Sequence, residues 1–131
     1  MHMITIITGL PGSGKSYFAG YLSKLTGAEY IGSDKIRFQI IKTPCYSDRE
    51  KQQVYDAILQ LTLRHARAGT NVVLDASFYS KDLRRMFSQA LAGTQRIVWI
   101  EVVAEERLIR ERLRRNLIFS SEAPTITWRR C

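Results

Sequence analysis

The stretch GLPGSGKS at residues 9–16 constrains the fold of this chain more than any other feature. It matches the pattern GxxxxGK followed by Ser or Thr, with Gly9, Gly14, Lys15 and Ser16 at the defining positions. An apolar run rich in isoleucine precedes the pattern, and apolar residues at helical spacing follow it. Glycines between a strand and a helix let backbone N–H groups turn towards phosphate oxygens, and the helix offers its positive end. The sequence therefore predicts a buried strand, a phosphate-binding loop and a helix, in that order.

The alternative for this stretch is an ordinary glycine-rich turn, but a predicted strand and a predicted helix stand on either side of it, as a phosphate-binding loop requires. We therefore expect the chain to bind ATP and Mg²⁺. Lys15 is expected to reach the β and γ phosphates, and the Ser16 hydroxyl is expected to ligand magnesium. The residues expected to contact the nucleotide are Gly9, Leu10, Pro11, Gly12, Ser13, Gly14, Lys15, Ser16 and Tyr17.

Strand patterns and helical patterns alternate along the rest of the chain. Further strands are predicted at 29–31, 72–74 and 96–103. The longest helical pattern covers 48–68, and the last predicted helix covers 103–118. Because strands alternate with helices, the chain is predicted to be a three-layer α/β domain with a parallel sheet covered on both faces.

Length and composition favour one domain and an anionic partner. With 131 residues, of which 45% are hydrophobic, the chain can bury one core but hardly two, so residues 1–131 are expected to form a single domain. No apolar run approaches the roughly 20 residues that span a bilayer, and the first residues lack a secretory signal, so a cytoplasmic protein without membrane contact is expected. The formal net charge of +8 favours nucleotides, phosphorylated metabolites or nucleic acid, and does not choose among them.

Two aspartates, Asp34 and Asp75, follow predicted strands. The carboxyl ends of parallel strands meet at one edge of a sheet, so both carboxylates are expected near Lys15. Asp75 is expected to hold magnesium together with Ser16. Many P-loop ATPases place a glutamate directly after this aspartate to orient the attacking water, whereas here the next residue is Ala76. This difference favours transfer of the γ phosphate to an acceptor over hydrolysis.

Asp34 is then the candidate to accept a proton from an acceptor hydroxyl. The alternative is that Asp34 is the N-cap of the helix KIRFQII, since aspartate is a favoured cap residue, and one residue can fill both roles.

An ordered set of motifs over nearly the whole chain is similar to a known family. The set consists of GLPGSGKS, SDKIR, YSDREKQQVYDAILQ, GTNVVLDASF, ERLIRERLRR and the SEA at 121–123. In these motifs the chain resembles small P-loop kinases, a family that includes the kinase domains of polynucleotide kinases, the zeta-toxin and chloramphenicol phosphotransferase groups, gluconate kinases and many predicted kinases of unknown acceptor. The loop motif alone is shared by a vast superfamily, whereas the ordered set is much more specific.

The resemblance implies a parallel sheet with strand order 2-3-1-4 and an ATP-dependent phosphotransferase that acts on a hydroxyl of a small molecule or of a nucleic acid end. It implies that Asp34 is the general base and that Arg37 helps to place the acceptor. With Asp75, these two residues form the expected substrate-binding set.

Arginines late in the 103–118 helix are implied to form a lid over the triphosphate, with Arg112 or Arg115 at the charge that develops during transfer. The family pattern there, RL followed by two residues and an arginine, is met at Arg112 and Leu113 but places Asn116 at the last position. The alternative for any single arginine is a solvated helix face balanced by nearby glutamates.

Two further departures from the family concern the acceptor and the end of the chain. Polynucleotide kinases usually carry an asparagine where this chain has Phe78, which weakens a nucleic-acid assignment. Relatives usually continue past SEA, so the tail 119–131, which has no clear periodicity, is expected to leave out a closing element. The strand at 96–103 would then be an unpaired apolar edge, and a homodimer through this edge is expected.

Three readings of the function stay open at this point. The first is the phosphotransferase, with a hydroxyl acceptor that the sequence does not identify. The second is a P-loop nucleotide-binding module or slow ATPase without acceptor chemistry. The third is a nucleic-acid enzyme similar to a 5′-hydroxyl polynucleotide kinase, or a nucleic-acid-binding protein that uses ATP as a switch, whose binding would weaken steeply with salt.

Overall fold

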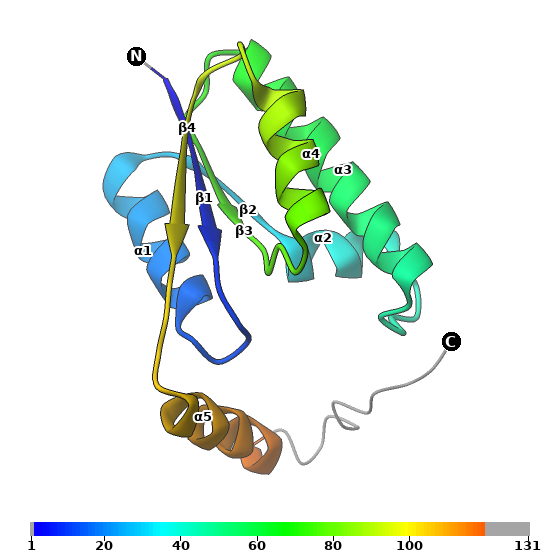
Figure 1. Ribbon diagram of the computed structural model, residues 1–131, viewed down its shortest axis with the longest axis vertical. Helices are drawn as coiled ribbons and strands as arrows, with labels where there is room; N and C mark the ends of the chain where they lie inside the picture. The colour runs from blue at the N-terminus through cyan, green and yellow to red at the C-terminus, as the bar shows by residue number, and fades with distance from the viewer. Residues whose placement is uncertain (1, 120–131) are drawn as a thin grey trace.

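A parallel sheet lies at the centre of the computed structural model, which describes residues 2–119 and the side chains of residues 2–115 (Figure 1). The strands are β1 (Met3–Thr8), β2 (Glu29–Gly32), β3 (Val72–Asp75) and β4 (Arg96–Glu101). Their order across the sheet is β2-β3-β1-β4, and each neighbouring pair is parallel. The expected parallel sheet and its 2-3-1-4 order are thus confirmed.

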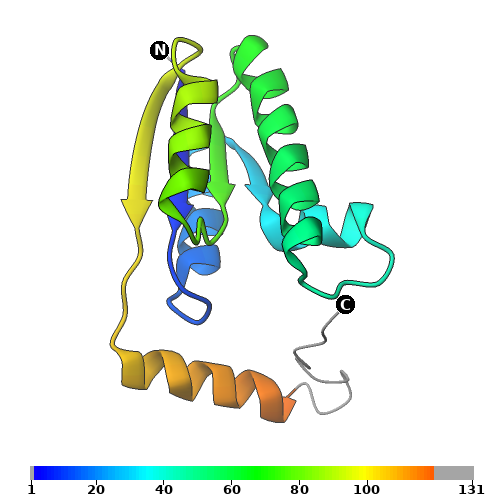
Figure 2. The ribbon, with the colours of Figure 1, turned by 45° about the vertical axis from the view of Figure 1, so that its right-hand side comes forward.

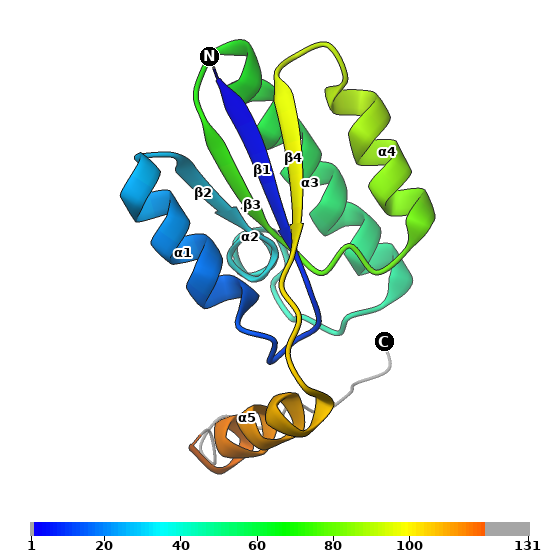
Figure 3. The same ribbon diagram turned by 60° about the vertical axis from the view of Figure 1, so that its left-hand side comes forward.

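Helices cover both faces of the sheet and the edge where its strands end (Figures 1 and 3). On one face lies α1 (Lys15–Thr26), and on the other lie α3 (Asp48–Arg67) and α4 (Lys81–Leu91). The short α2 (Ser33–Ile40) continues from β2 and packs on α3. The last helix, α5 (Glu106–Phe119), lies beyond the carboxyl ends of the strands (Figure 2). The three-layer α/β architecture is therefore as expected.

Side chains that alternate along the strands build a separate apolar core on each face of the sheet. In β1, Ile4 and Ile6 are fully buried in the core that α3 and α4 cover. Ile7 points to the opposite face, where it packs with Val73 and with Ala19 of α1. Both faces of the central strands are therefore covered by apolar side chains. This leaves the polar carboxyl ends of the strands as the place where a ligand can bind.

The last strand and the last helix are shifted from the expected boundaries. β4 ends at Glu101 and not at 103, because its partner strand β1 ends at Thr8, the residue in register with Glu101. The helix expected at 103–118 begins at Glu106 and runs to Phe119. Beyond Phe119, the expected tail lies outside the described residues.

β4 is an edge strand in the part of the chain that the structure describes. It pairs with β1 on one side only, and its inner residues 97–100 are half-buried and not fully buried. Among residues 2–119, no helix has the length and apolar character needed to cross a bilayer.

Candidate active site

The loop between β1 and α1 contains glycines at positive φ, among them Gly12 and Gly14. Gly14 is the N-cap of α1 at a φ of 96°, a left-handed conformation that other residues adopt only with strain. Gly12 has a φ of 84°, and a Cβ atom there would lie 3.1 Å from Cγ2 of Ile109 in α5. Glycine is therefore needed at Gly12 for the backbone conformation and also for the close approach of a second element.

This loop leaves hydrogen-bonding groups without partners. The first N–H groups of a helix have no intrahelical acceptor, and the first turn of α1 contains no acidic residue that would neutralise its positive end. The hydroxyl of Ser13 is buried and has no hydrogen-bond partner. A group rich in acceptor oxygens, such as a phosphate, would satisfy these groups together.

An ion pair joins the loop to the neighbouring strand. Nζ of Lys15 lies 3.2 Å from Oδ1 of Asp75, and both side chains are mostly buried. The register of the sheet explains the contact, because Asp75 pairs with Ile7 of β1, just before the loop begins. The structure thus brings Lys15 and Asp75 together at the carboxyl edge of the sheet, where the sequence analysis expects both.

The same edge offers oxygen atoms that fit magnesium. Oδ1 of Asp75 is buried and accepts no hydrogen bond, and Ser16 lies beside Lys15 in the first turn of α1. Among the described residues there is no group of three or more His, Cys, Asp or Glu side chains that could hold a metal ion. Magnesium is commonly held by one or two protein oxygens together with substrate phosphates and water, so one carboxylate and one hydroxyl suit an ion that enters with a nucleotide.

Tyr30 of β2, to which the sequence assigned no definite role, contacts the same carboxylate. Its hydroxyl donates a hydrogen bond to Oδ2 of Asp75. Burial raises the pKa of Tyr30 well above its usual value, and the hydrogen bond to Asp75 and the charges of Asp75 and Asp34 add to this, whereas a hydrogen bond from Ser16 partly offsets it. Tyr30 is therefore a protonated donor at neutral pH, bonded to the carboxylate of the predicted metal site.

Asp34 lies on α2, and 76% of its side chain is exposed to solvent. The N-cap of α2 is Gly32, without a side-chain cap, and Asp34 lies in the first turn. The alternative in which Asp34 caps this helix is therefore wrong. Gly32 is in register with Asp75, and Asp34 follows Gly32 by two residues, so Asp34 lies at the same carboxyl edge of the sheet as Asp75.

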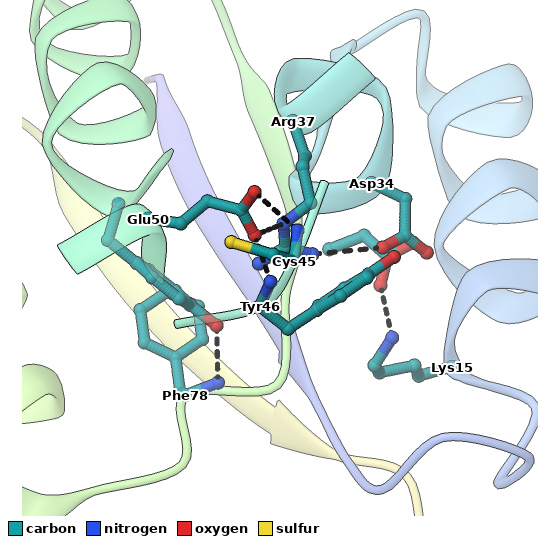
Figure 4. A network of polar contacts seen from close by, with 9 residues as sticks. Lys15, Asp34, Arg37, Cys45, Tyr46, Glu50 and Phe78 are labelled. Carbon is teal, nitrogen blue, oxygen red and sulfur yellow. Dashed lines mark hydrogen bonds and ion pairs between the residues drawn. The ribbon is translucent and has the colours of Figure 1, made fainter. Parts of the chain in front are cut away.

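Arg37 lies between Asp34 and Glu50, at the centre of a network of polar contacts (Figure 4). Its Nη1 lies 3.5 Å from Oδ1 of Asp34, and its Nε lies 3.4 Å from Oε2 of Glu50 in α3. The guanidinium carbon lies 4.3 Å from the ring centroid of Tyr46. Arg37 and Glu50 are almost completely buried, so Arg37 connects the exposed carboxylate to the start of α3.

Glu50 holds the segment that leads into α3. Its carboxylate accepts hydrogen bonds from the backbone N–H groups of Cys45 and Tyr46, at 2.9 and 2.6 Å. These bonds fix Tyr46 at a φ of 61°, which is uncommon for a residue other than glycine. Glu50 was not predicted as a site residue from the sequence, although Ser47 and Glu50 have the spacing of a capping box, in which a glutamate turns back to backbone donors before its own helix.

The arginines of α5 divide into two groups. Arg112 donates a hydrogen bond from Nη1 to the carbonyl oxygen of Gly12, at 3.1 Å, so this side chain reaches the loop. Arg115 instead pairs with Glu111 at 2.9 Å, and both are exposed. Of the two arginines expected to act on the phosphates, the structure places Arg112 at the loop and Arg115 on the outer face of the helix.

Phe78 lies outside this polar edge. It is 1% exposed and packs edge-on against Tyr55, Phe87 and Trp99. Its N–H group donates to the hydroxyl of Tyr55. The position that differs from polynucleotide kinases is thus part of the apolar core in this chain.

The fold and the site together define a class, that of P-loop nucleotide-binding domains with the strand order of small kinases. The family model described as an AAA domain (AAA_33) matches residues 4–130, and the chain belongs to this family. A comparison with curated proteins found no significant match.

Several solved structures with the same fold are named as kinases. The APS kinase of Mycobacterium tuberculosis in complex with AMPPNP and APS is 17% identical, with a TM-score of 0.76, and the alignment covers 93% of this chain and 74% of that one. A chain of the Pnkp1/Rnl/Hen1 RNA repair complex is 20% identical, with a TM-score of 0.74, and the alignment covers 88% of this chain and 38% of that one. A gluconokinase from Sinorhizobium meliloti 1021 is 20% identical, with a TM-score of 0.64, and the alignment covers 85% of this chain and 63% of that one.

Proposed function

We propose that this chain is an ATP- and magnesium-dependent phosphotransferase that moves the γ phosphate to a hydroxyl group. The observation that carries this proposal is the position of Asp34, an exposed carboxylate at the carboxyl edge of the sheet, on the same side as Lys15 (Figure 4). An exposed carboxylate at that point is accessible to an acceptor in solution, as a general base must be.

In this proposal, the amides of the loop and Lys15 bind the phosphates, and Ser16 and Asp75 hold the magnesium ion, which neutralises phosphate charge. Asp34 takes the proton from the acceptor hydroxyl. The acceptor oxygen then forms a bond to the γ phosphorus while the bond from that phosphorus to the β–γ bridging oxygen breaks, and ADP leaves.

Two other side chains bear on this assignment: Ala76 favours transfer over hydrolysis, and Arg112 suits phosphoryl transfer to either acceptor. Ala76, which follows Asp75, is 1% exposed, so this position offers no side chain to orient an attacking water. Arg112, which bonds to the loop, would neutralise charge on the transferred group, and this is the main requirement of a loose phosphoryl-transfer transition state. Arg37 contributes by holding Asp34, and a direct contact between Arg37 and the acceptor stays a prediction.

The acceptor is the open part of this proposal. The similar structures include an APS kinase, a gluconokinase and an RNA repair complex, which differ widely in chemistry. The net charge of +8 favours an anionic partner, and a polynucleotide 5′-hydroxyl end is the second candidate on this ground. Use of ATP is consistent with a cytoplasmic location, which also stays a prediction.

Replacement of Asp34 by asparagine tests the proposal. Asparagine nearly matches the shape of aspartate but cannot accept a proton at neutral pH, so transfer from labelled ATP should fall by roughly 10² to 10⁴. The acceptors to be screened are 5′-hydroxyl oligonucleotides, sugars and nucleosides. Binding of ATP and the thermal midpoint should stay nearly unchanged.

Three results would contradict parts of this assignment. Loss of ATP binding in Asp34→Asn would place Asp34 in the metal site. Transfer at the wild-type rate would exclude a general base at this position. Release of phosphate that no hydroxyl compound redirects would favour the slow ATPase.

A further inference from the structure

Tyr30 reaches Asp75 across a space that exists only because residue 32 is glycine. Gly32 lies in register with Asp75 in the β2–β3 pair, and Tyr30 precedes Gly32 by two residues on the same face of β2. A Cβ atom on Gly32 would lie 2.7 Å from the hydroxyl oxygen of Tyr30. The ring of Tyr30 therefore runs past Gly32 to its hydrogen bond with Oδ2 of Asp75.

The two oxygen atoms of Asp75 have different partners. Oδ2 accepts the hydrogen bond of Tyr30, whereas Oδ1 forms an ion pair with Lys15 but accepts no hydrogen bond. A neutral donor that holds one carboxylate oxygen fixes the orientation of the group without cancelling its charge. The other oxygen then stays available to a cation.

Nucleotide binding would change the partners of only one of these oxygens. If Lys15 turns to the phosphates, as a loop lysine does in this fold class, Oδ1 loses its ion pair. Among the described residues, Tyr30 is then the side chain that still donates to Asp75. A carboxylate that keeps no partner would rotate, and its affinity for a metal ion would fall.

We propose that Tyr30 is a positioning residue for the magnesium ion, which fixes the carboxylate of Asp75 through Oδ2, and that Gly32 is glycine in order to leave this path open. The inference rests on the proposed function insofar as Asp75 holds the metal. It assigns to Tyr30 a role in metal affinity and no contact with the acceptor or the phosphates.

The test is a titration of Mg²⁺ at a fixed ATP concentration, read as the rise in thermal midpoint. Tyr30→Phe keeps the ring and removes the hydroxyl, and the Mg²⁺ concentration for half of the effect should rise about 10-fold or more, as is usual for loss of a partner that orients a metal ligand. Gly32→Ala should shift the titration in the same direction, because its Cβ displaces the Tyr30 hydroxyl. Stabilisation by ATP in EDTA should be equal in the wild type and both variants.

Two controls separate the possible outcomes. Tyr21→Phe removes the hydroxyl of an exposed tyrosine on α1 and should leave the titration unchanged. Asp75→Asn should shift it at least as far as Tyr30→Phe. If Asp75→Asn has no effect, the metal site of the proposed function is wrong. The role of Tyr30 is refuted if Asp75→Asn shifts the titration but Tyr30→Phe leaves the Mg²⁺ concentration for half of the effect unchanged or lowers it. It is also refuted if Tyr30→Phe weakens ATP binding to the same extent in EDTA.

Discussion

The carboxylate of Asp75 connects three elements of the site. Lys15 approaches it from α1 and Tyr30 from β2, while Asp75 itself ends β3. A buried carboxylate is costly to leave unpaired, so the ion pair with Lys15 stabilises the ligand-free chain. A nucleotide must compete with this pair for Lys15. Part of the binding free energy is therefore used to separate Lys15 from Asp75.

Replacement of Lys15 by alanine should have two measurable effects. The ligand-free thermal midpoint should fall, because Asp75 loses its counter-charge. Magnesium and ATP stabilise the wild type by mass action, and most of this additional shift should disappear in the variant. Both effects can be read from thermal unfolding with and without the ligands.

Lys24→Ala provides the matched control, since Lys24 lies in the last turn of the same helix and is exposed. It should retain the shift with magnesium and ATP. A full shift in Lys15→Ala would mean that the loop is not the main phosphate site.

At the scale of the elements, α5 is the part that closes over the loop. Ile109, Arg112 and Leu113 recur at helical spacing, and all three approach Gly12 or its neighbour. On the opposite face, Arg110 and Arg115 pair with glutamates one turn earlier. The helix therefore has one face directed at the loop and one directed at solvent.

This division predicts different effects for two similar substitutions on α5. Arg112→Ala should lower transfer strongly, by roughly 10³, because an arginine that neutralises the transferred phosphoryl group has an effect of this size in related chemistry. Arg115→Ala removes an exposed pair within one helix, which is worth only about 0.3–0.5 kcal/mol, and should transfer at nearly the wild-type rate. Single-turnover assays with labelled ATP compare the two variants. A larger loss in Arg115→Ala would assign the lid to the other face.

The elements of this fold could be predicted more fully than its contacts. Apolar runs and the loop motif predicted the strands and α1, and the family resemblance supplied the strand order. The end of β4 depended on where β1 stops, which no local pattern contains. The hydrogen bond from Tyr30 to Asp75 joins residues 45 positions apart, and Tyr30 alone looks like any aromatic residue of a strand. The capping-box spacing between Ser47 and Glu50 could have identified Glu50. It could not have shown that the backbone N–H groups of Cys45 and Tyr46 donate to its carboxylate.

At the scale of the whole molecule, the β4 edge of the sheet lies away from the site, whereas β2, the other edge strand among the described residues, contributes Tyr30 to it. The site is built at the ends of β1, β2 and β3 and is closed by α5. β4 contributes no side chain to the contacts described at the site, and in residues 2–119 its outer side is unpaired. Half-buried apolar residues on such an edge are a template for association with another chain.

The chain is therefore expected to dimerise through β4 as its concentration rises. Light scattering over a wide concentration range should show a mass that increases towards a dimer, and the outward-facing amides of β4 should exchange hydrogen more slowly at high concentration. A constant monomer mass with unchanged exchange would exclude this edge as an interface.

Gly32 and Tyr30 place a joint constraint on how this sequence can change. The backbone of Gly32 has a φ of −114°, which any residue can adopt, so its conformation alone does not require glycine. The requirement comes from the Tyr30 hydroxyl, which occupies the place of a side chain. In evolutionary terms the two positions form one unit: a larger residue at position 32 displaces the Tyr30 hydroxyl, so it removes the benefit of a tyrosine at position 30.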